Sequence, residues 1–463
     1  MLDLVLANGT VVTPEGPANV DIGISGERIA ALGGRGQLAR VAQRSISVSG
    51  KIVVPGGIDP HVHCNWPFLN PRTGGNEITF GQDVVSRAAL HGGTTMLVDF
   101  VGSTSQPSLV RAAEKQAEDW TGSCYCDFSF HLVLRGEVPE ETIAEIPEAI
   151  EAGWPSFKIY TTNIRPTRTD LKIAYGSLWE IFRQTRKDGI VCVHAEDDDL
   201  VMHMHRKLSK AGLTSFEHMP EVHSSLSEDL SFRRVIRLAE HEDAALYMMH
   251  VSAAFGVEAI AEARRSGLPI FGETLPQYAL HTQDDYLEPD GMKYHTYPSI
   301  KTKKDAEALW AGMRSGDIST LGTDELCTTY EMKTAGRRID DVVGGNAGVE
   351  PRLALCYTEI VNRRGMSLNR FVDLTSGNAA RIMGMYPQKG CIAVGSDADL
   401  AVLDPNGGRT LTAAELHETD YTPWEGWKVD AWPVMTILRG EVVVDKDGFH
   451  ATPKHGRRIA RRR

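Results

Sequence analysis

Histidines that follow predicted strands are the first residues in this sequence that could perform chemistry. His61 and His63 stand one residue apart, directly after the apolar run Val53-Val54-Pro55-Gly56-Gly57-Ile58-Asp59-Pro60. Because side chains alternate along a strand, both imidazoles lie on the same side of its end. Two imidazoles directed at one point favour a divalent metal ion. The alternative is one polar core histidine beside one surface histidine.

Four other polar groups lie in or at the end of later predicted strands. They are Lys158 in strand 156–160, His194 in 190–196, His250 in 245–252 and Asp324 in 318–324. Any one of them could be structural: a satisfied core histidine, or a lysine that reaches solvent or pairs with a carboxylate. The carboxyl ends of barrel strands meet at one mouth, so the whole set predicts a site for two divalent metals.

Lys158 has a particular use in such a site. Burial would lower the pKa of its amine, because desolvation disfavours the charged form. A neutral amine can react with carbon dioxide to form a carbamate, an anion with two oxygens that can bridge two metals.

The elements that must position these groups alternate between strand and helix. Predicted strands cover residues 52–63, 94–100, 127–134, 156–160, 190–196, 245–252, 269–274 and 318–324. Predicted helices include 80–91, 109–120, 176–187, 226–240 and 254–266, and three more lie around 351–364, 368–375 and 378–383. Apolar strands separated by helices predict a buried parallel sheet. Eight of them predict an α/β fold, a TIM-type (β/α)8 barrel.

Both ends of the chain have a different pattern. Residues 1–51 and 385–450 hold short alternating strands with turns such as Asn8-Gly9, which are typical of antiparallel sheets. Neither run alone makes a stable sheet, so we predict a small β-sandwich built from both termini. The barrel domain, which carries the predicted metal site, then spans residues 52–384. The basic tail 451–463 is expected to be solvated or to contact another subunit.

Composition limits the partners and the compartment. The chain has 463 residues, 42% of them hydrophobic and 24% charged, which is typical of a soluble globular enzyme. Its formal charge of -12 argues against nucleic acid and anionic membranes as partners. We find no signal peptide and no apolar run long enough to span a membrane. The seven cysteines lack zinc-finger spacing, so we predict a reducing, cytoplasmic location.

These motifs resemble those of the amidohydrolase superfamily, and most closely those of the hydantoinase and dihydropyrimidinase family of cyclic amidases. The similarity covers nearly the whole chain, through segments 55–63, 92–100, 156–160, 193–196, 250–252, 272–278 and 389–399. The resemblance implies two divalent ions, with zinc as the default and manganese or cobalt also suited to these ligands. It implies that one ion is held by His61, His63 and Asp324, the second by His194 and His250, and both by carboxylated Lys158 and a bridging hydroxide.

The resemblance also implies a reaction and an assembly. The hydroxide attacks a carbonyl in the ring of a hydantoin, a dihydropyrimidine or a related cyclic ureide or imide, and the ring C–N bond opens. Asp324 acts as general base and then as general acid. Family members form homotetramers or homodimers. Two alternatives remain open: an allantoinase- or dihydroorotase-like amidase, and a non-catalytic dihydropyrimidinase-like scaffold. Dihydroorotases carry an arginine where this chain has Asn65, and the scaffolds have lost ligands that this chain keeps.

The substrate side departs from the family pattern. Asn163 stands where hydantoinases have a tyrosine that assists the oxyanion, so either this amide, Tyr160 or a shifted loop donates the hydrogen bond. Glu325 follows Asp324 where histidine is usual. Segments 297–301 and 344–348 match main-chain contacts to the ring amide, which makes Tyr297 and Gly344 candidate substrate contacts.

Three arginines lie in loops that follow the metal-binding segments. Arg72 belongs to the loop after His63, whereas Arg165 and Arg168 belong to the loop after Lys158. A guanidinium matches the two oxygens of a carboxylate, so Arg72 or Arg165 could pair with an acidic ring substituent. The alternative is that they are surface arginines.

Overall fold

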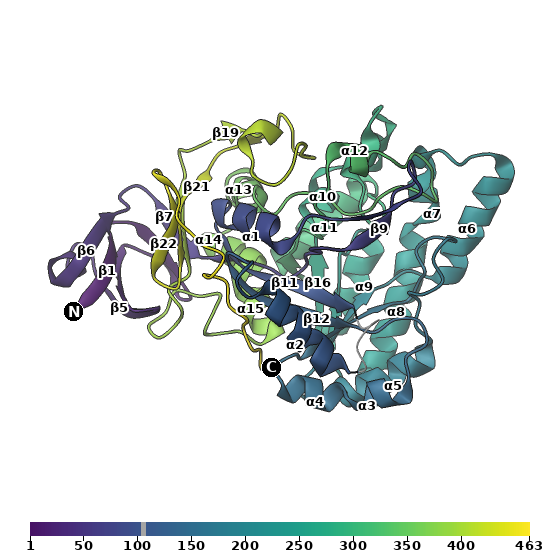
Figure 1. The fold of residues 1–463 in the computed structure, drawn as a ribbon, viewed down its shortest axis with the longest axis horizontal. Coiled ribbons are helices and arrows are strands. Elements are labelled where there is room, and N and C mark those ends of the chain that lie inside the picture. Colours follow the sequence, from purple (N-terminus) through teal and green to yellow (C-terminus); the bar gives the residue numbers. More distant parts are fainter. Residues whose placement is uncertain (103–107) are drawn as a thin grey trace.

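The computed structural model describes residues 1–102 and 108–463, and it contains the predicted barrel. One sheet holds eight parallel strands in consecutive order, each pairing with the next. The strands are β8 (Gly57–Asp59), β11 (Thr94–Gly102), β12 (Asp127–Val133), β13 (Ser156–Tyr160), β14 (Ile190–His194), β15 (Leu246–Met248), β16 (Ile270–Thr274) and β17 (Ile318–Leu321). Helices surround this sheet (Figure 1). The TIM-type fold is therefore confirmed.

The first and last strands of the barrel meet just beyond their ends. Val62, after β8, forms a parallel bridge with Glu325, after β17. The His63 N–H donates a hydrogen bond of 2.7 Å to the Glu325 carbonyl oxygen. This closure places the residues that follow β8 beside those that follow β17.

The predicted helices are present between the strands. They are α1 (Gln82–His91), α2 (Leu109–Trp120), α5 (Tyr175–Thr185), α8 (Ser225–His241), α9 (Ala254–Arg265), α13 (Arg352–Tyr357), α14 (Leu368–Val372) and α15 (Asn378–Met383). The outer layer also includes α4 (Ile146–Glu151), α6 (Asp198–Ala211) and α11 (Lys303–Ser315). The buried face of α1 includes Val85, Ala88 and Ala89. Within the described residues, none of the helices has the length and hydropathy needed to cross a bilayer.

Residues 52–63 form two short strands rather than the single strand predicted. β7 (Ile52–Pro55) pairs with strands of the sandwich, whereas β8 pairs with β11 in the barrel. Gly56 lies between them, where a Cβ atom would be 2.1 Å from Thr95 Oγ1. The chain therefore passes from one sheet to the other at a point where the backbone touches a neighbouring side chain, and glycine is required there.

Both termini build the sandwich, as predicted. One sheet has the order β5 (Arg28–Gly34), β4 (Val20–Ser25), β1 (Leu2–Ala7) and β6 (Ala42–Ser47). The other has the order β23 (Gly448–Phe449), β22 (Glu441–Asp445), β21 (Trp432–Leu438), β18 (Leu400–Asp404), β7, β2 (Thr10–Thr13) and β3 (Gly16–Ala18). Purple N-terminal and yellow C-terminal strands lie side by side in Figure 1. Leu6, Ile22, Val53 and Leu400 share one apolar core between the sheets. The exact domain limits stay a prediction.

The basic tail folds back onto the barrel, so the expectation of a solvated tail is wrong for its end. The Ile459 N–H donates to the Phe128 carbonyl oxygen at 2.8 Å. Arg461 is fully buried, and its guanidinium donates to Ser129 Oγ at 2.8 Å and Ser156 Oγ at 2.7 Å. These partners lie near the starts of β12 and β13, at the end of the barrel opposite the metal-binding candidates. The basic side chains satisfy buried acceptors there.

We expect the buried acid Glu418 to make the folded protein less stable as pH rises. Burial and the nearby Glu350 raise the pKa of Glu418 from 4.5 to about 8. Below pH 4.5 both the folded and the unfolded chain carry this proton. Between pH 4.5 and 8 only the folded chain keeps it, so the free energy of unfolding falls by up to about 1.4 kcal/mol per pH unit.

The variant Glu418→Gln should flatten this decline, since glutamine is neutral at every pH and can still accept the Glu350 N–H bond. Urea unfolding at several pH values between 5 and 8 measures the slope. The exposed Glu415→Gln is the matched control. A slope that is the same in Glu418→Gln and in the parent protein would contradict the assignment.

Candidate metal centre

All six predicted metal-binding residues lie in one place. His61 and His63 follow β8, Lys158 lies in β13, His194 ends β14, His250 follows β15, and Asp324 follows β17. All six side chains are buried, and all six line one cavity of about 450 Å³. The carboxyl ends of the parallel strands therefore bring together the six side chains that we predicted as metal ligands.

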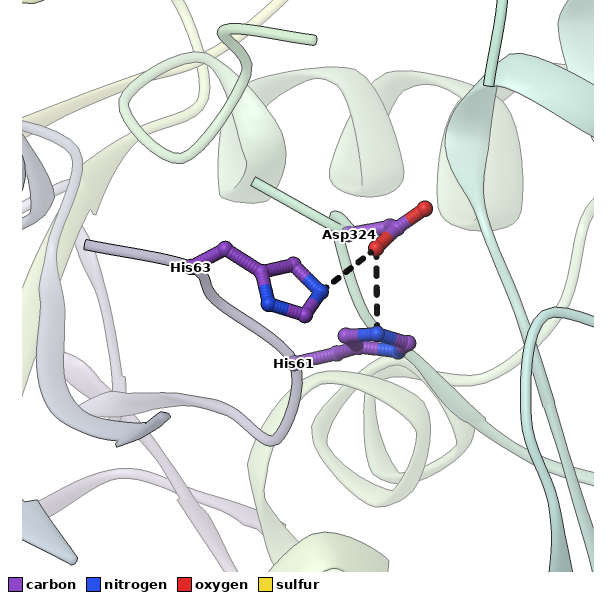
Figure 2. Close-up of side chains that lie close together, drawn as sticks. All are labelled: His61, His63 and Asp324. Atoms are coloured by element: carbon purple, nitrogen blue, oxygen red, sulfur yellow. Dashed lines mark hydrogen bonds and ion pairs between the residues drawn. The ribbon is translucent and has the colours of Figure 1, made fainter. Parts of the chain in front are cut away.

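His61, His63 and Asp324 converge on a single carboxylate oxygen (Figure 2). Asp324 Oδ1 lies 3.0 Å from His61 Nε2 and 3.1 Å from His63 Nε2. On the other side of the His61 ring, Nδ1–H donates to Glu273 Oε1 at 2.7 Å. This bond orients the ring so that Nε2 of His61 faces the cavity.

His194 and His250 form a second pair. His194 Nδ1 and His250 Nε2 are 3.0 Å apart. His194 Nε2–H donates to Glu196 Oε2 at 3.1 Å, so its Nδ1 carries a lone pair. Glu196 is held in turn by His223, whose Nδ1 is 2.9 Å from Glu196 Oε1. A carboxylate behind the imidazole is the usual support of a histidine that binds metal.

The Lys158 side chain is buried. In the described part of the chain no acidic oxygen lies within ion-pair distance of Nζ, and the close polar contact is Met249 Sδ at 3.0 Å. Burial lowers the pKa of Lys158 from 10.5 to about 8. The neutral form of the amine, which reacts with carbon dioxide, is therefore more populated near pH 7 to 8 than it is in an exposed lysine.

These groups fit divalent ions. Three donor atoms of His61, His63 and Asp324 lie within 4.8 Å of one another. Imidazole nitrogen and carboxylate oxygen are ligands that zinc, manganese and cobalt accept. His194 Nδ1 and His250 Nε2 face each other at 3.0 Å. At this distance a proton or a cation must lie between the two nitrogens, because two lone pairs would repel each other. The residues present therefore suit a centre of two ions.

Three supporting side chains were not assigned a role from the sequence. Glu196 lies two residues after His194, and Glu273 lies in β16 at the carboxyl end of the barrel. Their positions at strand ends were the signal that could have revealed them. His223 lies in a loop before α8, and nothing in its spacing pointed to Glu196.

The substrate side of the cavity includes Tyr297, Gly344 and Arg165. Tyr297 and Gly344 lie against each other, because a Cβ on Gly344 would be 2.3 Å from Tyr297 Cδ2. Tyr160 also lines the cavity, two residues after Lys158 on the same side of β13.

Asn163 and Arg72 are not among the residues that line it. The Asn163 side-chain oxygen accepts the N–H groups of Leu171 at 3.1 Å and Lys172 at 3.0 Å, so it closes its own loop. Arg72 Nη1 lies 3.2 Å from Glu331 Oε1.

Glu325 supports the loop that contains Gly344. Its Oε2 accepts the N–H groups of Gly348 at 2.8 Å and Val349 at 3.0 Å. The glutamate side chain that replaces the usual histidine is fully buried, and it fixes the main chain of this loop.

A barrel with this cluster at its mouth defines a class of metal-dependent hydrolases, and comparison with known proteins agrees. Residues 52–443 match the model of the amidohydrolase family. The chain belongs to this family.

Within it, the chain belongs with the hydantoinases and dihydropyrimidinases. It is 34% identical to a D-hydantoinase of Geobacillus stearothermophilus, over 99% of this chain and 96% of the relative. It is 32% identical to a D-hydantoinase of Streptomyces coelicolor, over 98% and 96%. The crystal structure of dihydropyrimidinase from Brevibacillus agri superimposes with a TM-score of 0.92 at 32% identity, covering 100% of this chain and 99% of that one. The chain is thus an enzyme of the cyclic-amidase class.

Proposed function

We propose that this protein opens the ring of a hydantoin, a dihydropyrimidine or a related cyclic ureide or imide by hydrolysing a ring C–N bond. The observation that carries this proposal is the convergence of six ligand-type side chains in one cavity. The full-length similarity to proteins named D-hydantoinase supports the choice of substrate. We further propose a cytoplasmic homotetramer or homodimer that uses zinc.

The ligands are divided between two ions in this proposal. His61, His63 and Asp324 would hold one ion, His194 and His250 would hold the other, and a carboxylated Lys158 would be a ligand of both. When bound, the ions lower the pKa of a water molecule and polarise a carbonyl group. The carbamate adds a negative charge that offsets part of theirs.

Asp324 moves the proton in the proposed reaction. Water oxygen forms a bond to the ring carbonyl carbon, and the C–N bond breaks. The Asp324 carboxylate takes a proton from the attacking water and delivers it to the leaving nitrogen. Thr296 Oγ1 donates to Asp324 Oδ2 at 2.5 Å and so orients the carboxylate. A hydantoin would yield an N-carbamoyl amino acid.

Tyr160 is the donor that we propose for the developing oxyanion, in place of Asn163. Burial raises the pKa of Tyr160 to about 12, so its hydroxyl keeps a proton to donate. Loss of one oxyanion donor typically lowers kcat by about 100- to 1000-fold, and we expect this for Tyr160→Phe. Steady-state kinetics on the metal-loaded protein measures it. Asn163→Ala is the comparison, and a larger kcat loss in Asn163→Ala than in Tyr160→Phe would reverse the assignment.

A panel of cyclic compounds tests the function itself. Purified protein, loaded with zinc or stripped by chelator, is assayed for ring opening of hydantoins, dihydropyrimidines, cyclic imides, allantoin and dihydroorotate. We expect metal-dependent opening of hydantoins or dihydropyrimidines. Activity confined to allantoin or dihydroorotate would favour the alternative amidases. Protein that opens none of these rings after zinc has been added would favour a non-catalytic scaffold.

A further inference from the structure

Three arginines gather on one wall of the cavity, with one acid between them. Arg135, Arg165 and Arg168 all line it. Asp170 Oδ2 lies 3.1 Å from Arg135 Nη1, and Asp170 Oδ1 lies 3.7 Å from Arg168 Nε. Among residues 1–102 and 108–463 we find no ion-pair partner for Arg165. The wall therefore carries a surplus of positive charge.

The acids elsewhere in the cavity do not neutralise this wall. Asp119 pairs with Lys115, and Asp324 lies between His61 and His63. An anion from outside the chain is therefore the group that would balance the charge of the three arginines.

Two of these arginines are less exposed than Arg72, which lies outside the cavity. The side chain of Arg135 is 22% exposed and that of Arg168 is 35% exposed, whereas Arg72, outside the cavity and paired with Glu331, is 49% exposed. Burial lowers the pKa of Arg168, and the charges of Arg165 and Arg135 add to this effect. The fold therefore keeps these positive charges close together in a partly buried environment.

The wall and the metal centre line the same cavity, and Tyr160 lines it as well. Tyr160 ends the strand that carries Lys158, and its hydroxyl is close enough to both Arg168 and Asp324 for their charges to shift its pKa in opposite directions. Ile164 and Trp66 add apolar surface to the same cavity. A ring at the metal centre could thus extend a short carbon chain along Tyr160 to the arginines.

We propose that the natural substrate is a cyclic ureide or imide whose ring substituent ends in a carboxylate, and that Arg165 and Arg168 bind this carboxylate. The inference rests on the proposed ring-opening function. Arg165 and Arg168 share one turn, in which the Arg168 N–H donates to the Arg165 carbonyl oxygen at 3.0 Å. Two guanidiniums on one turn offer a carboxylate several charge-assisted hydrogen bonds.

The test compares hydantoin bearing a carboxyethyl group at ring carbon 5 with its carboxamide, which has the same shape and no charge. We expect the parent protein to show a kcat/KM at least about 10-fold higher for the acid, the scale of a charge-assisted contact. Arg165→Met should remove most of this preference and change kcat/KM for the amide by less than about twofold. Arg72→Met, the matched control, should leave both values unchanged.

Two further measurements separate carboxylate binding from a general structural effect of the substitution. Arg165→Lys should retain part of the preference, because it keeps the charge but not the fork of donors. Calorimetry should show that the parent binds the ring-opened acid product more tightly than the amide product. Both products carry the carboxylate that ring opening creates, so salt should weaken binding of both, and weaken that of the acid product, with its second carboxylate, more strongly. Equal losses for acid and amide in Arg165→Met, or no preference in the parent, would overturn the inference and leave ring opening intact. Failure of metal-loaded protein to open either ring would instead contradict the proposed function.

Discussion

Asp324→Asn is expected to lower kcat for ring opening by about 100- to 10,000-fold. General acid–base catalysis by a positioned side chain is typically worth this factor, and an amide cannot take up the proton. Asparagine keeps the size of aspartate, so the Thr296 contact and the fold should survive. Steady-state kinetics with a saturating cyclic ureide, together with metal content, measures the effect.

The exposed Asp447→Asn is the control for this change, since it lies in the turn between β22 and β23. We expect its kcat to match that of the parent. An Asp324→Asn variant that retains more than about a tenth of the parent kcat would show that another group transfers the proton.

Lys158→Ala should abolish most of the activity and reduce the metal content. If the carbamate holds both ions, its loss removes several kcal/mol of metal-derived stabilisation of the transition state, which corresponds to at least about 1000-fold in kcat. Elemental analysis should show fewer than two ions per chain.

Added short carboxylic acids should partly restore activity to Lys158→Ala, because they supply two oxygens in the space left by the side chain. Exposed Lys115→Ala is the control and should behave like the parent. Full metal content and undiminished kcat in Lys158→Ala would exclude a ligand role for this lysine.

The barrel could be predicted from the sequence because its signals are local. Apolar strands such as 190–196 and amphipathic helices such as 109–120 have their own periodicity, and both are found in the structure. The split of residues 52–63 into β7 and β8 could not be predicted in this way. It depends on which sheet each half pairs with, and that choice is made by partners far away in the chain, such as β18. The buried place of Arg461 likewise depends on acceptors more than 300 residues earlier.

The candidate site also has a part that could be predicted from the sequence and a part that could not. The positions of His61, His194 and Asp324 follow from strand ends, because a parallel barrel brings those ends together whatever the details of the loops. Side chains in the loops are harder to place from the sequence, because residue spacing does not determine where a loop side chain points. Asn163 therefore turns to Leu171 and Lys172 instead of lining the cavity, and the link between His223 and Glu196 is visible only in three dimensions.

Zinc titration of chelator-treated protein, with metal content and ring opening followed in the same samples, is the most direct test of the proposed metal centre. We expect activity to be absent at the start, to rise with added zinc, and to reach its plateau at two ions per chain. Ring opening at full rate without metal, or a plateau in binding below two ions with full activity, would contradict a centre in which these six side chains hold two ions.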